Sequence, residues 1–154
     1  PKARNINKEL EFQEGNFNQL AYWMNREIID DYPLELNSPV DWTDETKDIN
    51  DRVRSYLDVN CGHCHSPSGN ANSTGLYLHL NETRDIHLGV FKKPVATGRG
   101  SGGLKYSIVP GKPDESILLH RMISMDPGIM MPESGRALTH EEAVEMVREW
   151  IYGL

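Results

Sequence analysis

The sequence predicts a mainly α-helical protein with long irregular loops, and three observations support this fold class. Apolar residues recur at three- and four-residue intervals in four separate stretches, which is the period of an amphipathic helix. The middle of the chain, residues 71–113, is rich in Gly, Pro and other turn-forming residues. The length of 154 residues suits one domain of ordinary size, which can bury a core.

The N-terminal region is expected to contain one helix. Residues 1–15 are polar and aperiodic, so we expect them to be poorly ordered. An apolar stripe from Phe17 to Ile28 predicts a helix, for which Asn16 is the candidate N-cap. Residues 31–45 carry two prolines and several acids and therefore indicate a linker or wrapping loop.

A second helix is expected from about Asp48 to Asn60. Its apolar face consists of residues at helical spacing, namely Ile49, Val53, Tyr56 and Leu57. In the irregular middle, Leu76, Leu78 and Leu80 alternate with polar or aromatic residues, which favours one short strand.

Two further helices are expected near the C-terminus. Asp114 is the candidate cap of a helix that continues through Ile123. The stretch Thr139-His140-Glu141-Glu142 has the pattern of a capping box and predicts the start of the last helix. The apolar stripe of that helix consists of Ala143, Val144, Val147, Trp150, Ile151 and Leu154.

The charge of the chain limits its partners. The formal net charge is −7, which argues against nucleic acid and anionic membrane surfaces and favours a partner with a basic face. No apolar run approaches the length of a transmembrane helix. The chain opens with the polar stretch 1–4, so we expect any targeting segment to lie upstream of this fragment.

The motif Cys61-Gly62-His63-Cys64-His65 carries the chemistry of the chain. Its spacing, Cys-x-x-Cys-His, is the attachment signature of c-type haem. Cys61 and Cys64 are the only two cysteines, and each would form a thioether with one vinyl group of the porphyrin. His65 follows directly and is placed to ligate the iron. The motif therefore predicts one covalent haem c per chain.

Three other interpretations of these patterns are a zinc site, a redox dithiol and a dinucleotide-binding loop. A zinc site needs four ligands, and no second Cys/His knuckle is present. A redox dithiol expects a strand-to-helix junction, which is not predicted here. Residues 98–103 formally match Gly-x-Gly-x-x-Gly, but the βαβ context of a dinucleotide site is missing. We expect instead a loop whose bare backbone lies close to another surface.

A methionine is the expected second iron ligand. Four methionines lie in the right region, and Met122 falls on a helical stripe, where a core position explains it best. Met125 is possible but less constrained by its surroundings. Pro132 favours an extended conformation at Met131, so Met130 and Met131 would point to opposite sides. The stiffness of the adjacent proline favours Met131 over Met130.

These motifs together resemble those of class I c-type cytochromes. The resemblance lies in segments 57–65, 109–116 and 130–132, and it extends over roughly Thr46 to Trp150. The same segments are similar to those of cytochrome domains at the C-terminal end of larger exported bacterial proteins. This similarity implies further domains upstream and a periplasmic or extracellular location. The resemblance implies a class I cytochrome fold around the haem, in which the first and last helices cross. Residues 1–45 would form an extension with one extra helix, and residues 46–154 the cytochrome domain.

The resemblance implies electron transfer rather than enzymatic catalysis. Ligation by His65 and Met131 would occupy both axial positions and leave the iron no place for a substrate. The expected partner is a redox protein that exchanges single electrons with the chain. The alternative is a catalytic or sensing haem whose distal methionine is displaced by peroxide or a diatomic ligand; His120 is the nearest candidate for a distal acid–base group.

The haem propionates need a charged or polar partner. Arg99 is the predicted partner, because a guanidinium matches a carboxylate in bidentate fashion and glycines surround it. Tyr106 or Lys105 is the second choice. Arg136 is the rival candidate for the propionate partner. It lies just after the methionine loop, the loop that contains Met130 and Met131.

Overall fold

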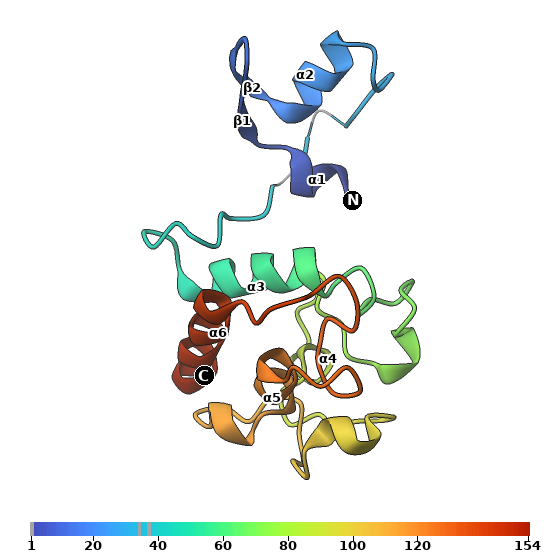
Figure 1. The fold of residues 1–154 in the computed structure, drawn as a ribbon, viewed down its shortest axis with the longest axis vertical. Coiled ribbons are helices and arrows are strands. Elements are labelled where there is room, and N and C mark those ends of the chain that lie inside the picture. The colour runs from blue at the N-terminus through green and yellow to red at the C-terminus, as the bar shows by residue number, and fades with distance from the viewer. Residues whose placement is uncertain (1, 34, 37) are drawn as a thin grey trace. The chain divides into compact units, whose positions relative to one another are not determined.

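A computed structural model describes residues 2–33, 35–36 and 38–154 of the chain. The protein is mainly α-helical, with one small two-stranded sheet in the described residues (Figure 1). It divides into two compact units, Pro1–Val40 and Asp41–Leu154, and each is described by itself below.

The first unit contains a β-hairpin that the sequence analysis did not predict. Helix α1 (Ala3–Ile6) precedes strands β1 (Glu9–Phe12) and β2 (Gly15–Asn18), which pair antiparallel, with Phe12 opposite Gly15. Gly15 has a φ of +126°, which a side chain would disfavour at this tight turn. The expectation of poor order is therefore wrong for residues 2–15, because backbone pairing in the hairpin organises this polar segment, while residue 1 lies outside the described residues.

Helix α2 (Gln19–Asn25) is shorter than the sequence pattern predicted. Its cap is Asn18 rather than Asn16, and the side-chain oxygen Oδ1 of Asn18 accepts hydrogen bonds from the amides of Leu20 and Ala21 at 3.0 and 3.2 Å. Phe17 belongs to β2, where its side chain is exposed. The apolar residues of this segment thus belong to two elements, β2 and α2. The helical spacing of apolar residues does not show where the strand ends and the helix begins.

The second unit begins its regular structure with α3 (Ile49–Asn60), close to the predicted bounds. Three short 3₁₀ turns and the helix α4 (Asp85–Leu88) interrupt the long loops that follow; the turns are Asn72–Thr74, Gly98–Ser101 and Pro113–Glu115. Two longer helices complete the unit, α5 (Ile117–Ile123) and α6 (Glu141–Gly153). The predicted loop character of residues 31–45 is confirmed for the described residues of that segment.

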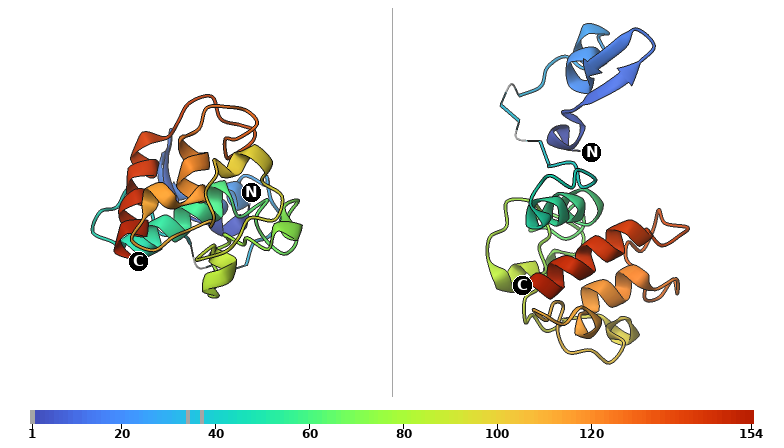
Figure 2. Two further views of the ribbon diagram at one scale, coloured as in Figure 1. Left: turned by 90° about the horizontal axis from the view of Figure 1, so that it is seen from below. Right: turned by 90° about the vertical axis from the view of Figure 1, so that its left-hand side faces the viewer.

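The core of the second unit lies where α6 packs against both α3 and α5 (Figures 1 and 2). Val53 of α3 and Val147 of α6 are completely buried. The predicted stripes of α3 and α6 therefore face this core, with the exception of Leu154, which is half exposed at the end of the chain. Burial of these apolar faces supplies the main stabilisation of the unit.

Two sequence-based expectations about helix starts are wrong. Asp114 does not cap α5; its carboxylate instead accepts a hydrogen bond from Arg148 of α6 at 2.6 Å. Thr139 does not cap α6, because its hydroxyl is directed to the carbonyl oxygen of Ile123 at 3.4 Å and to the sulfur of Met125. In both cases tertiary partners replace the local helix amides.

The segment that carries Leu76, Leu78 and Leu80 forms no strand. Its backbone amides are bonded elsewhere: Leu78 donates to the carbonyl of His65 at 2.8 Å, and Leu80 donates to the Asp58 carboxylate at 3.0 Å. A strand requires a neighbouring strand to accept these bonds, and this segment lies against the motif and α3 instead.

Candidate haem site

The Cys-x-x-Cys-His motif begins where α3 ends. Asp48 caps the start of α3, and Cys61 occupies its C-cap, donating its amide to the carbonyl of Leu57 at 2.8 Å. A Cβ on Gly62 would lie 2.8 Å from the carbonyl oxygen of Asp58, so the chain can turn this closely only with glycine at that position. The predicted delivery of the motif by a helix C-terminus is confirmed.

The motif itself is a tight turn held by its own backbone. The carbonyl of Cys61 accepts hydrogen bonds from the amides of Cys64 and His65, at 3.1 and 2.8 Å. Gly69 then passes so close to the carbonyl of Cys64 that a side chain there would collide with it. Both cysteines are free thiols, each partly exposed at the level of the whole residue. Both are therefore available for covalent attachment.

The ring of His65 is placed to act as a neutral ligand. Its carbonyl accepts the amide of Leu78, which fixes the backbone, and its Nδ1 is buried with no hydrogen-bond partner among the described residues. Burial lowers the pKa of His65; the backbone of Leu76 opposes this effect, and Arg121 adds to it. A neutral imidazole is the form that binds iron, so this environment suits an axial ligand.

The thiol of Cys61 is protonated at neutral pH. Burial, with a further contribution from Cys64, raises the pKa of Cys61 to about 12. In the part of the chain that the structure describes, no group of three or more His, Cys, Asp or Glu side chains is arranged to hold a metal ion. The residues therefore do not assemble the four-ligand zinc site that was weighed as an alternative.

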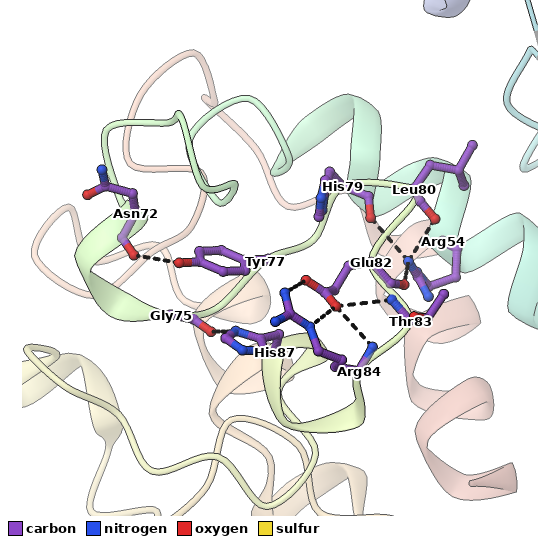
Figure 3. Close-up of polar contacts among 10 residues, drawn as sticks. All are labelled: Arg54, Asn72, Gly75, Tyr77, His79, Leu80, Glu82, Thr83, Arg84 and His87. Atoms are coloured by element: carbon purple, nitrogen blue, oxygen red, sulfur yellow. Dashed lines mark hydrogen bonds and ion pairs between the residues drawn. The ribbon is translucent and has the colours of Figure 1, made fainter.

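The segment after the motif is fastened to α3 by Arg54, as Figure 3 shows. One amino group of Arg54 donates to the backbone carbonyls of His79, Leu80 and Glu82, at 3.1, 3.0 and 2.7 Å. Glu82 is only 4% exposed and accepts from both the side chain and the amide of Arg84. These bonds stiffen the loop that carries Leu78, the hydrogen-bond partner of His65.

A stacked pair of rings supports the same loop. The rings of Tyr77 and His87 stack at 4.8 Å between centroids, with planes 4° apart. His87 Nδ1 lies 2.9 Å from the carbonyl of Gly75, and the Tyr77 hydroxyl donates to the carbonyl of Asn72 (Figure 3). His87 is therefore engaged in holding the loop.

The methionine loop lies between α5 and α6. Met122 is buried in the core, as its helical stripe predicted, and Met125 is half exposed. Met130 and Met131 are both partly buried, and a cis peptide bond joins Met131 to Pro132. The amide of Met131 donates to the carbonyl of Arg121 at 2.9 Å, so the loop is anchored at this residue.

Arg121 is bonded to the methionine loop. Its guanidinium influences the ring of His65, its Nε donates to the carbonyl of Ile129 at 2.7 Å, and its backbone carbonyl holds Met131. Arg121 thus holds the methionine loop at two backbone points, Ile129 and Met131. The pKa of Tyr56, on α3, is raised to about 12. Burial is the main cause; Cys61 adds to the rise and Arg136 opposes it.

The predicted propionate partners occupy different surroundings. Arg99 is exposed and pairs with Asp126, at 2.9 Å between its amino group and the carboxylate. The ring of Tyr106 lies edge-on to Phe91, with centroids 5.8 Å apart. Arg136, the rival, has a buried Nε without a hydrogen-bond partner among the described residues. A buried donor of this kind fits a carboxylate acceptor.

The glycine-rich turn at residues 98–101 does lie against another surface. A Cβ on Gly102, the residue that follows, would fall 2.6 Å from Nε2 of His120, and Gly102 has a φ of +58°. The turn packs on α5, and the elements of the described residues form no βαβ unit around it. Sequence reasoning found the glycines but missed Arg54 and Arg121, because their hydrogen bonds go to backbone carbonyls, which leave no mark in the sequence.

Comparison with protein-family models, with curated proteins and with solved structures finds no match to this chain. None of the helices in the described residues has the length and apolar character needed to cross a bilayer. The site is therefore assessed on its own chemistry. Two free thiols, an imidazole with a buried unpaired nitrogen and a methionine whose backbone is anchored to Arg121 are the kinds of groups that hold haem c.

Proposed function

We propose that this chain is a monohaem c-type cytochrome domain with a class I fold that transfers single electrons. The observation that carries the proposal is the Cys-x-x-Cys-His turn at the end of α3, where two free thiols precede a partly buried His65 whose Nδ1 has no hydrogen-bond partner among the described residues. A motif match alone would leave the distal ligand undefined. Here the free thiols of Cys61 and Cys64 lie at the end of α3, and Met131, whose backbone is held by Arg121 and Arg136, is the proposed sixth ligand.

The residues have distinct roles in this proposal. Cys61 and Cys64 would hold the haem through thioether bonds, and His65 and Met131 would ligate its iron. When bound, the haem supplies one-electron chemistry at its iron, and thioether ligation raises the reduction potential relative to two histidines. The protein contributes burial, a stiff proximal loop and a fixed methionine loop.

Charge on the second unit supports a redox partner with a basic face. The exposed side of α6 carries four acids, Glu141, Glu142, Glu145 and Glu149, in a chain of formal net charge −7. Complementary charge increases the rate of encounter between redox proteins. Because haem is attached to such motifs outside the cytoplasmic membrane in bacteria, the proposal also includes export to the periplasm or beyond.

The test is covalent retention of haem. The chain is produced in a host that matures c-type cytochromes, denatured, and weighed by mass spectrometry beside a Cys61→Ser/Cys64→Ser double variant. We expect one haem to remain on the wild-type chain and none on the variant. A wild-type chain that is colourless, or that loses its haem on denaturation, would refute the proposal.

A charge-transfer spectrum separates the two functional classes. Electron transfer predicts low-spin ferric haem with a sulfur-to-iron band and no binding of peroxide at moderate concentration. A high-spin ferric spectrum with rapid ligand binding would instead support the catalytic or sensing alternative.

A further inference from the structure

The side chain of Arg136 gathers three backbone carbonyls from both ends of the methionine loop. One amino group donates to the carbonyls of Met122 and Met131, at 2.5 and 3.0 Å. The other amino group donates to the carbonyl of Ser124. Met122 lies in the last turn of α5 and Ser124 is its C-cap, so Arg136 ties the end of this helix to the residue predicted to ligate the iron.

Two of these contacts give hydrogen-bond donors to backbone carbonyls at the C-terminal end of α5. The last carbonyls of a helix have no partner within it, and a cation is favoured there by the helix dipole. Arg136 supplies both the hydrogen-bond donors and the positive charge at the end of α5. The same guanidinium also donates to the carbonyl of Met131. A planar guanidinium can serve three acceptors in a fixed arrangement, which the single ammonium of lysine cannot reproduce.

The position of Arg136 also relates to the motif. Arg136 lowers and Cys61 raises the pKa of Tyr56, a residue of α3. Met131 is held from two sides, by the carbonyl of Arg121 through its amide and by Arg136 through its carbonyl. Both peptide groups that flank the Met131 side chain are thus restrained.

We infer that Arg136 is a positioning residue that clamps the Met131 loop to the end of α5 and so keeps the methionine sulfur at the distal position. This inference rests on the proposed function, since it assigns a role at the same site. It differs from a propionate contact, because the clamp acts through the backbone of Met131 and requires the fork of the guanidinium as well as its charge.

The experiment compares Arg136→Lys with Arg148→Lys in the haem-loaded protein. Arg148 lies on α6, pairs with Asp114 and Glu145, and serves as a matched control for the loss of one guanidinium. Imidazole is titrated against ferric protein, and displacement of methionine is followed by loss of the sulfur-to-iron band. We expect imidazole to bind at least tenfold more tightly to Arg136→Lys than to wild type, with Arg148→Lys unchanged.

Hydrogen exchange gives a second measurement that does not need the haem. The amide of Met131 should exchange at least tenfold faster in Arg136→Lys, while amides of α3 remain protected. Unchanged imidazole affinity together with unchanged exchange at Met131 would overturn the clamp. A chain that binds no haem yet shows faster exchange at Met131 would refute the proposed function and leave the clamp standing.

Discussion

The indole nitrogen of Trp150 on α6 donates a hydrogen bond to the side-chain oxygen of Asn50 on α3, at 3.2 Å. Trp150 is 5% exposed, so this bond lies at the edge of the core where the two helices meet. It joins the start of α3 to the end of α6, and the buried valines of both helices pack beside it. The packing of these helices holds α3, and therefore the motif that follows it, in place.

Truncation of Leu57 should destabilise the second unit strongly. Leu57 is 1% exposed on α3, one turn before Cys61. We expect Leu57→Ala to lower the free energy of unfolding by about 2–5 kcal/mol, as for other buried leucines. Urea unfolding followed by circular dichroism measures this loss. The control is Leu138→Ala, whose side chain is 77% exposed and whose change should stay within about 0.5 kcal/mol.

Replacement of Met131 should affect the haem more than replacement of Met130. Met131 is the residue whose amide and carbonyl are both held, by Arg121 and Arg136. We expect Met131→Ala to abolish the sulfur-to-iron band, to lower the reduction potential and to open the iron to added imidazole. Met130→Ala serves as the neighbouring control and should change these properties only slightly. Loss of the band in Met130→Ala alone would reverse the assignment.

The pair Arg99–Asp126 allows a test of the propionate prediction. If Arg99 contacts a propionate, Arg99→Leu should shift the reduction potential and its dependence on pH, and Asp126→Asn should shift them less. If the guanidinium serves only the surface pair with Asp126, both variants should leave the potential unchanged. Potentiometric titration from pH 5 to pH 9, with circular dichroism to confirm the fold, distinguishes these results.

Acid should weaken the loop after the motif through Glu82. Hydrogen bonds from Arg84 lower the pKa of Glu82 from 4.5 to about 2. Because the unfolded chain binds this proton at higher pH than the folded one, the stabilisation is complete above pH 4.5 and is lost as the pH falls towards 2. The side chain of Arg84 is 61% exposed, so we expect an effect of no more than about 1 kcal/mol.

The Glu82 effect is measured as the difference in urea midpoint between pH 6 and pH 3. Glu82→Gln retains the size of the side chain without its titration, so its midpoint should fall less than that of wild type over the same interval. Equal losses in both proteins would show that other carboxyls cause the acid sensitivity.

The sequence by itself determined the features that depend on short spacing. Two cysteines and a histidine within five residues define an attachment motif before any folding is considered. The apolar stripes of α3 and α6 follow from a helical period that repeats over three turns, and both were predicted with nearly correct bounds. Local chemistry and local periodicity act over a few residues, so the sequence displays them directly.

Only the tertiary structure decided which polar groups hold the site together. Arg54, Arg121 and Arg136 each donate to backbone carbonyls of other segments, and every residue except proline offers the same amide and carbonyl. The sequence therefore cannot distinguish these arginines from solvated ones. Asp114 and Thr139 show the converse, because a distant partner outcompeted the helix amides that their local patterns favoured.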